Sequence, residues 1–283
     1  MGKIADALKK AGFEKDVPPQ RDTKPPPEVK ETAPKARIEH KNHDTSSVRS
    51  EPGQGFISPK LVVYHKPDSM AAEHFKVLRS QILYPRDGVE RRVILVTSAI
   101  EQEGKTFVAC NLAVSISQGI DPYALLIDAD TRLPSVHTFL GINAQEGLSD
   151  YLQKDQPLSR FLVKTPLTKL TILPGGNPPR NPAELLTSSK MTMLLEEARE
   201  RYSDRFIILD SPPVNLAAET LTLSKLADAV IFVVRYGKSN RDIVEQAVEK
   251  IGREKILGVV FNGFEVTPRK YAYYKDRYRY YSR

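Results

Sequence analysis

The chain has 283 residues, of which 40% are hydrophobic and 27% charged, and its net charge is +7. This length fits one α/β domain of about 200 residues with an appendage, and the basic balance favours anionic partners such as nucleic acid, phospholipid head groups or acidic proteins without choosing among them. The single cysteine, Cys110, excludes an intramolecular disulfide and a zinc or redox site built on cysteine alone. No apolar run approaches the roughly 18 residues that cross a bilayer, and no signal-peptide core opens the chain, so we expect a cytoplasmic protein.

The first 60 residues predict two segments outside the folded domain. In residues 1–16, Ile4, Leu8 and Ala11 recur at helical spacing with lysines opposite, which predicts a short amphipathic helix that docks on a partner or lies at a membrane surface. A frayed helix without a role is the alternative, because so short a helix is marginal alone. Residues 17–60 hold eight of the twenty-one prolines and little apolar content, so we expect a disordered tether.

From residue 61 onward, strand-length apolar runs alternate with helical patterns. Residues 69–83 predict a helix, and further helical stretches occur at 105–118, 187–202 and 239–251. The predicted strands are 93–96, 124–127, 170–173, 206–209, 229–234 and 256–261. Because these runs are continuous rather than alternating, both faces of each strand are covered, which is typical of a mostly parallel central sheet flanked by helices. We therefore predict one α/β domain over residues 61–266, with its ligand beyond the carboxyl ends of the strands.

A phosphate-binding motif follows the first predicted strand. Gly104, Lys105 and Thr106 come after a short loop and open the next predicted helix. Backbone N–H groups at such a helix start cradle phosphates, the lysine reaches the β and γ oxygens, and the threonine hydroxyl can bind Mg²⁺. The pattern departs from the full P-loop at Ala99 and at Gln102, where glycine is common. Because GKT triplets also arise by chance, this motif needs support from elsewhere in the chain.

Acidic residues follow two further predicted strands. Asp128, Asp130 and Arg132 come just past strand 124–127, and Asp210 ends strand 206–209. Carboxylates at strand ends can hold Mg²⁺ directly or through water, and can accept a proton from an attacking hydroxyl. A single such aspartate is more often a helix N-cap or turn residue. Three of them on strand ends beside a GKT loop favour a P-loop NTPase that binds ATP and Mg²⁺.

These segments resemble the bacterial protein-tyrosine kinases that regulate capsule and exopolysaccharide synthesis. The resemblance covers roughly residues 61–283 and rests on TSAIEQEGKT as Walker A, LLIDADTRLPSVH as the family's second Walker motif, FIILDSPPV as Walker B, the connecting segment LPGGNPPRNPAELLTSSKM and the tyrosine-rich end. The opening MGKIADALKKAG resembles the start of stand-alone kinases from exosortase-linked polysaccharide loci. The resemblance implies an ATP- and Mg²⁺-dependent autokinase that phosphorylates tyrosines on the tail of a neighbouring copy and regulates polysaccharide synthesis or export.

The resemblance also implies roles for individual residues. Lys105 would neutralise the β and γ phosphates, Asp128 would be the base for the tyrosine hydroxyl with Asp130 sharing base or metal duty, and Asp210 would hold Mg²⁺ through water. The implied catalytic residues are Lys105, Asp128, Asp130 and Asp210, the metal ligands are Thr106, Asp128 and Asp210, and the nucleotide contacts are Glu103, Gly104, Lys105, Thr106, Phe107, Arg132 and Asn262. A surface salt bridge for Arg132 and a turn role for Asn262 remain open alternatives.

Partners follow from the same resemblance. Glu73, Lys76 and Arg79 resemble the family's subunit-contact motif, although lysine replaces its middle arginine and loses the planar fork that pairs bidentately with carboxylate. An ordinary solvated helix face is the alternative. The resemblance implies a homo-oligomeric ring, a separate transmembrane chain-length regulator that activates the kinase at the inner face of the cytoplasmic membrane, a cognate tyrosine phosphatase and no nucleic-acid partner.

Residues 267–283 form a basic tail that concentrates tyrosine. Six of the chain's twelve tyrosines lie there, and these predicted phosphoacceptors are Tyr271, Tyr273, Tyr274, Tyr278, Tyr280 and Tyr281. Residues 269–283 carry six basic side chains against one acidic, a charge of +5, and each phosphotyrosine adds about −1.5 to −2, so three or four modifications reverse the sign. We expect a switch in which a tail attracted to an acidic metal site is repelled once phosphorylated. A tail that binds RNA or membrane through stacking aromatics is the alternative.

Two other classes of function fit parts of the pattern. A positioning ATPase of the related deviant Walker group would carry a signature lysine where this chain has Ile100, and it would give the tyrosine tail no role. A catalytically weak nucleotide-binding scaffold would account for the departures at Ala99, Gln102 and Lys76. The intact GKT motif and the three aspartates argue against a scaffold.

Overall fold

The computed structural model describes residues 55–264, except residues 202 and 203. The predicted helix 1–16, nearly all of the predicted tether and the tyrosine tail therefore lie outside the described residues. The first described residues already pack on the domain. The amide of Ser58 donates to the carbonyl of Phe139 at 3.0 Å, and Leu61 is fully buried.

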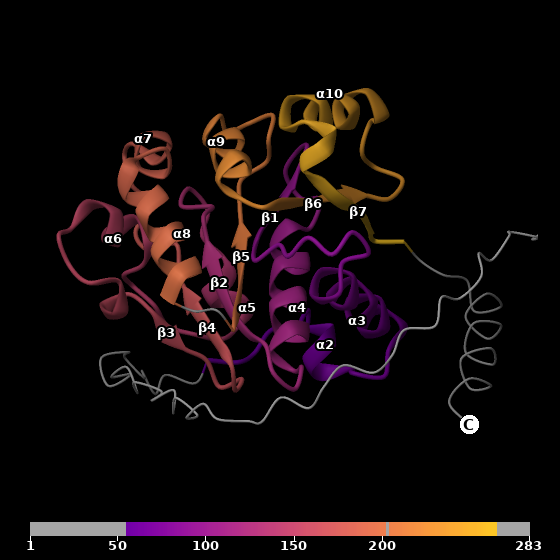
Figure 1. The fold of residues 1–283 in the computed structure, drawn as a ribbon, viewed down its shortest axis with the longest axis horizontal. Helices are drawn as coiled ribbons and strands as arrows, with labels where there is room; N and C mark the ends of the chain where they lie inside the picture. Colours follow the sequence, from indigo (N-terminus) through magenta and orange to yellow (C-terminus); the bar gives the residue numbers. More distant parts are fainter. Residues whose placement is uncertain (1–54, 202–203, 265–283) are drawn as a thin grey trace, which may run out of the picture. The chain divides into compact units, whose positions relative to one another are not determined.

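A seven-stranded sheet in the order β3-β4-β2-β5-β1-β6-β7 forms the centre of the domain (Figure 1). Neighbouring strands are parallel except β3 and β4, which form a short antiparallel pair. The strands are β1 (Val93–Ser98), β2 (Tyr123–Asp128), β3 (Val163–Lys164), β4 (Leu170–Leu173), β5 (Arg205–Asp210), β6 (Ala229–Arg235) and β7 (Ile256–Asn262). All six predicted strands are confirmed, and the two-residue strand β3 was missed.

Helices connect the strands and cover both faces of the sheet. They are α2 (Val62–His65), α3 (Met70–Leu83), α4 (Lys105–Ser117), α5 (Val136–Phe139), α6 (Leu148–Gln153), α7 (Pro182–Leu186), α8 (Ser189–Arg201), α9 (Glu219–Leu226) and α10 (Arg241–Ile251), with 3₁₀ turns η2 (Leu158–Arg160) and η3 (Arg253–Lys255). The four predicted helices correspond to α3, α4, α8 and α10 and are confirmed. The short helices α2, α5, α6 and α7 and the eight-residue α9 give too little periodicity to be found from sequence.

The strand side chains divide between two apolar layers. In β1, Val93 and Leu95 pack with residues of α6 to α10, whereas Ile94 and Val96 pack with residues of α2 to α5. Successive strand residues point to opposite faces of a sheet, so each strand needs apolar residues at every position when both faces are covered. This explains the continuous apolar runs of the sequence and identifies the domain as an α/β three-layer fold.

The helix α4 lies at the centre of one layer and is buried along most of its length. Its residues from Val108 to Ser117 are all buried, because the helix packs against β1, β2 and β5 on one side and against α2 and α3 on the other. A helix that is apolar all round is typical of such a buried position. The start of α4 is therefore held firmly beneath the carboxyl end of β1. Within the described residues, no helix combines the length and the apolar character needed to span a membrane.

Candidate nucleotide and magnesium site

The predicted phosphate loop connects β1 to α4. Gly104 takes a φ of 97° immediately before the first residue of α4, and a Cβ there would collide with the side-chain amide of Asn262. Only glycine fits both the backbone conformation and this close approach. Lys105 is buried and Thr106 half-buried, and both open the helix. The loop therefore presents N–H groups, an ammonium and a hydroxyl at one helix N-terminus, as phosphate binding requires.

Glu103 anchors this loop to the segment that follows β6. One of its oxygens accepts the amide of Ile100 at 3.0 Å and the other accepts the hydroxyl of Ser239. The side-chain amide of Asn262 donates to the carbonyl of Glu103 at 2.8 Å. Gln102 takes a φ of 61°, a conformation that glycine would adopt without strain. The buried Glu103 thus stabilises a loop in which the preceding residue, Gln102, stands where glycine is common.

Two aspartates face each other at the carboxyl ends of adjacent strands. Asp128 of β2 and Asp210 of β5 are register partners, and both are fully buried. Asp128 accepts backbone amides from Ser135 at 2.8 Å, Val136 at 3.0 Å and Asp130 at 3.2 Å. Within residues 55–264, no donor makes a hydrogen bond of ordinary geometry to either carboxylate oxygen of Asp210, although the Thr106 hydroxyl lies close to it. A buried carboxylate with free lone pairs is costly unless a cation or proton occupies them.

The electrostatics of the pair follow from this burial. Burial raises the pKa of Asp210 to about 7, although the nearby Thr106 hydroxyl and Lys105 ammonium favour its ionised form. Burial and the charge of Asp210 raise the pKa of Asp128 well above its usual range, against the opposing effect of its backbone hydrogen bonds. Burial also raises the pKa of Asp130. The site therefore concentrates negative charge that a divalent cation would stabilise.

The residues present fit Mg²⁺. This ion keeps several waters and is usually bound through one or two carboxylates together with substrate phosphates, rather than by a full protein cage. Among the described residues, no group of three or more histidine, cysteine or acidic side chains forms such a cage. Thr106 lies beside the pair, with its hydroxyl 3.3 Å from that of Ser135. The carboxylate of Asp210, the hydroxyl of Thr106 and the carboxylate of Asp128 are the groups that would hold the ion beside the phosphates.

Two predicted nucleotide contacts have other partners in the structure. The guanidinium of Arg132 pairs with the buried carboxylate of Glu219 at 2.9 Å, which joins the segment after β2 to α9. The ring of Phe107 packs edge-on against Phe75 of α3 at 5.9 Å. The salt bridge left open by the sequence for Arg132 is therefore formed, although its partner is buried rather than on the surface.

The predicted subunit-contact residues lie on α3. The ammonium of Lys76 pairs with Glu73 at 2.5 Å within the helix, and Arg79 donates to the carbonyl of Ser115 at 2.6 Å. A neighbouring face of α3 and the edge strand β7 enclose an apolar groove of about 760 Å³. Its lining includes Val77 of α3 and Val259, Phe261 and Phe264 at the sheet edge.

Several residues of the site escaped sequence reasoning. Ser239 binds Glu103 and Glu219 binds Arg132 from positions 136 and 87 residues away in the chain. Ser135 and Val136 contribute backbone amides, which leave no mark on residue type. The predicted phosphoacceptor tyrosines lie outside the described residues.

The parallel sheet, the glycine-capped phosphate loop and the facing aspartates define a P-loop NTPase. No family model matches the chain. It is 32% identical to tyrosine-protein kinase YwqD of Bacillus subtilis (strain 168), over 77% of this chain and 93% of that protein. The crystal structure of the chimerical protein CapA2B2 matches with a TM-score of 0.68 and 32% identity, over 76% of this chain and 94% of that one.

A structure of septum site-determining protein MinD complexed with Mg-ADP, from Pyrococcus horikoshii, matches with a TM-score of 0.52 at 20% identity, over 63% of this chain and 75% of that one. That likeness supports the fold alone. The chain belongs to the bacterial tyrosine-protein kinases, as its 32% identity to YwqD over nearly the whole of that protein shows.

Proposed function

We propose that the protein is an ATP- and Mg²⁺-dependent tyrosine autokinase that transfers the γ-phosphoryl group of ATP to its C-terminal tyrosines and acts in capsule or exopolysaccharide synthesis. The observation that carries this proposal is the buried pair Asp128 and Asp210, with the unsatisfied oxygens of Asp210, next to Lys105 and Thr106. The relatives named as tyrosine kinases support the same reaction.

The reaction divides among these residues by position. The backbone N–H groups at Gly104 and the ammonium of Lys105 bind the β and γ phosphates and offset their charge. Asp128, whose carboxylate is oriented by three backbone amides, takes the proton of the tyrosine hydroxyl. The phenolic oxygen then bonds to the γ phosphorus while the bond from that phosphorus to the β–γ bridging oxygen breaks, and ADP leaves. Asp130 lies beside Asp128, where its charge further raises the pKa of Asp128, and it would share the base or metal role.

The metal has a defined place in this scheme. When bound, Mg²⁺ would supply positive charge that offsets the charge developing on the leaving group. Asp210 would hold the ion through water, and Thr106 would supply a hydroxyl ligand from the first turn of α4. Phosphoryl transfer depends mainly on such positioning and electrostatic stabilisation.

The direct test is autophosphorylation of the full chain. The protein is incubated with Mg²⁺ and γ-labelled ATP beside a Lys105→Met control, and labelled residues are mapped by mass spectrometry. We expect label on Tyr271 to Tyr281 and a loss of about 100-fold or more in the control, because an electrostatic contact to the transferred group is removed. ATP hydrolysis without tyrosine label would instead favour a positioning ATPase. If neither tyrosine labelling nor ATP hydrolysis is observed, the alternative that remains is a nucleotide-binding scaffold.

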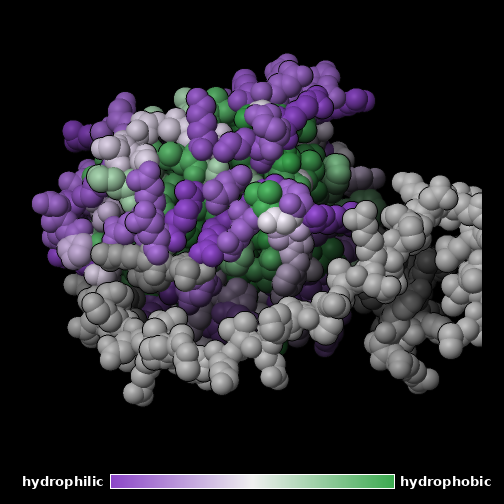
Figure 2. Space-filling model, in the orientation of Figure 1, coloured by the Kyte–Doolittle hydropathy of each residue, from purple (hydrophilic) through white to green (hydrophobic). Residues whose placement is uncertain are grey.

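Assembly and location belong to the same proposal. The protein would form a ring through α3, whose groove face and the neighbouring β7 expose large apolar side chains, with Val77 at 48% and Phe261 at 62% exposure. Figure 2 shows hydrophobic surface among the polar side chains of this view, including the region below the hydrophilic helix α10. The kinase would be cytoplasmic, recruited to the inner membrane face by a separate transmembrane regulator, reset by a tyrosine phosphatase and independent of nucleic acid.

A further inference from the structure

The loop after β4 lies next to Asp128, the predicted base. Gly175 in this loop is buried, and a Cβ added to it would lie 2.6 Å from the Cβ of Pro134 and 3.5 Å from the Cγ of Asp128. The loop therefore forms one wall of the pocket that holds the Asp128 carboxylate. The oxygens of Asp128 accept the backbone amides of Ser135 and Val136, which directly follow Pro134. The position of the carboxylate therefore depends on the Gly175 loop and on the segment after Pro134.

Asp150 of α6 clamps this loop. One oxygen of its carboxylate accepts two backbone amides, from Gly147 at 3.0 Å and from Asn177 at 3.3 Å. The other oxygen accepts the side-chain amide of Asn177 at 3.3 Å and the ammonium of Lys154 at 3.2 Å. Although burial opposes ionisation, hydrogen bonds from Gly147, Asn177 and Lys154 hold the pKa of Asp150 below its usual value. Asp150 is thus an ionised, buried acceptor for the loop backbone.

The backbones of residues 147–149 and 174–176 pack so closely that no side chain fits between them. The amide of Leu148 donates to the carbonyl of Pro174 at 2.7 Å, and that of Ser149 donates to the carbonyl of Gly175 at 3.1 Å. Gly176 takes a φ of 78°, and a Cβ there would lie 2.5 Å from an oxygen of Asp150. A Cβ at Gly147 would collide with the Pro174 carbonyl. The glycines let α6 and residues 174–177 interlock as one rigid unit.

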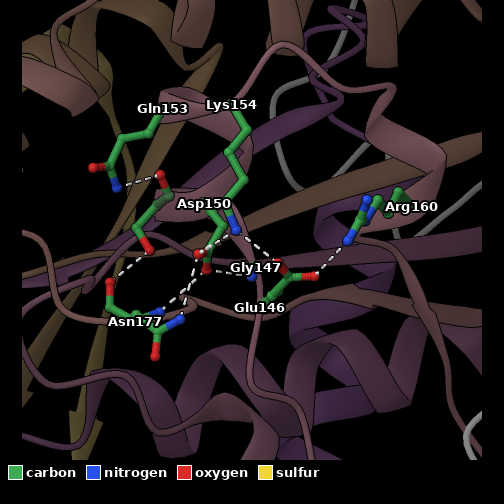
Figure 3. Close-up of polar contacts among 8 residues, drawn as sticks. Glu146, Gly147, Asp150, Gln153, Lys154, Arg160 and Asn177 are labelled. Carbon is green, nitrogen blue, oxygen red and sulfur yellow. Dashed lines mark hydrogen bonds and ion pairs between the residues drawn. The ribbon is translucent and has the colours of Figure 1, made fainter.

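An outer ion-pair network surrounds Asp150. Figure 3 shows its carboxylate between Lys154 and Asn177, with Glu146 beyond the ammonium of Lys154. Glu146 pairs with Lys154 at 2.6 Å and with Arg160 at 3.5 Å. The Lys154 side chain is 42% exposed, so these outer pairs contribute little to stability. The hydrogen bonds of Asp150 to the loop backbone are the part that acts on the site.

We propose that Asp150 is a positioning residue for phosphoryl transfer: by locking residues 174–177 against Asp128, it fixes the carboxylate that receives the tyrosine proton. This inference rests on the proposed function, because it assumes that role for Asp128. Most of the proposed nucleotide contacts belong instead to the phosphate loop, which Glu103 anchors to Ser239 after β6 and to Asn262 at the end of β7. Loss of Asp150 should therefore change catalysis much more than ATP binding.

Three variants of the full chain separate this role from a general structural one. Asp150→Ala removes both acceptor oxygens, and we expect a 10- to 100-fold fall in kcat for tyrosine phosphorylation, since small misplacements of reacting groups have effects of that size. Asp150→Asn keeps one carbonyl oxygen for the amides of Gly147 and Asn177, so kcat should stay within about threefold of wild type. Lys154→Met, the control, removes the ion pairs of Lys154 with Glu146 and Asp150 but keeps the amides of Gly147 and Asn177 on the Asp150 carboxylate, and it should leave kcat within about twofold. The KM for ATP should change by less than about threefold in all three proteins.

Gly175→Ala provides a second route if Asp150→Ala does not fold. The added methyl group meets Pro134 and Asp128, and it should lower kcat at least tenfold with ATP affinity retained. The inference is overturned if Asp150→Ala keeps wild-type kcat, or if Lys154→Met loses as much kcat as Asp150→Ala.

Amide hydrogen exchange decides the inference independently of activity. The amides of Ser135 and Val136 donate to Asp128, so they should exchange at least tenfold faster in Asp150→Ala and at the wild-type rate in Lys154→Met. If the wild-type protein forms no phosphotyrosine, the proposed function fails, yet faster exchange would still support the positioning role. Unchanged exchange at Ser135 and Val136 would overturn it.

Discussion

Replacing Asp210 with asparagine tests whether the buried carboxylate of the candidate metal site destabilises the folded protein when it is ionised. Burial raises the pKa of Asp210 from 3.8 to about 7. The folded protein then holds a proton that the unfolded chain has released, so stability falls as the pH rises from about 4 to about 7, and above pH 7 the ionised carboxylate carries its full cost. One pKa unit corresponds to about 1.4 kcal/mol. Between pH 5 and pH 8, the wild-type protein should therefore lose about 3 kcal/mol of unfolding free energy relative to Asp210→Asn.

Urea unfolding at pH 5, 6, 7 and 8 in Mg²⁺-free buffer measures this difference. The buried amide of Asp210→Asn lacks a partner and costs about 1 to 3 kcal/mol at every pH, so only the change of the difference with pH is diagnostic. Equal m values in the two proteins ensure that the same surface is exposed on unfolding. Parallel stability curves for the two proteins would refute the reasoning. Added Mg²⁺ with nucleotide should stabilise the wild-type protein selectively, since binding to the folded state adds stability.

Three further predictions address the surroundings of the site. Ser239→Ala removes a hydrogen bond to the buried Glu103 carboxylate and should weaken ATP binding about tenfold, measured by titration with a fluorescent nucleotide, whereas wild-type affinity would show that the phosphate loop does not need this anchor. Arg132→Ala leaves the carboxylate of Glu219 buried and unpaired, so the free energy of unfolding in urea should fall by about 3 kcal/mol. Adding Glu219→Gln in the double variant should partly restore it. A loss of kinase activity with unchanged stability would instead assign Arg132 to the phosphates. The third variant carries phenylalanine at all six tail tyrosines, which are Tyr271, Tyr273, Tyr274, Tyr278, Tyr280 and Tyr281. It should incorporate no phosphate label, and ATP should no longer loosen its oligomer, as measured by light scattering. An oligomer that responds to ATP as the wild type does would exclude the charge switch.

The sheet was predictable because its strands are buried on both faces. Runs such as 93–96 and 206–209 are apolar at every position, and the structure pairs them as the parallel neighbours β1 and β5. Strand β3 was not predictable, since two residues carry no period. Helix α6 was missed for the same reason: its six residues begin at a glycine cap rather than at a serine or aspartate.

The proximity of the two strand-end aspartates was predictable from a different principle. Asp128 and Asp210 each end an apolar strand, and the carboxyl ends of parallel strands meet at one edge of the sheet. Their proximity could therefore be predicted from the sequence even though the strand order was unknown. It could not predict that they are direct register partners, because that depends on β5 inserting between β1 and β2.

The anchors of the site were beyond sequence reasoning, because each joins segments that are distant along the chain. Glu103 meets Ser239 across 136 residues, and Asp150 meets Asn177 across 27. In each case the acidic residue lies in a loop or a short helix, where an exposed position is the ordinary expectation for its type. Only the packing of β6 and of the 174–177 loop makes these carboxylates buried acceptors.

These two anchors lie on opposite sides of Asp128 and the proposed phosphate loop. Glu103 holds that loop through partners after β6 and at the end of β7, and Asp150 holds the loop after β4, which contacts Asp128. Strands β1, β2 and β5 lie between these edges of the sheet. A change at one anchor should therefore alter ATP affinity, and a change at the other should alter the rate of transfer. Combining Ser239→Ala with Asp150→Ala should give additive free-energy effects, as is usual for sites that share no partner, and strong non-additivity would show that the phosphate loop and the base are positioned as one unit.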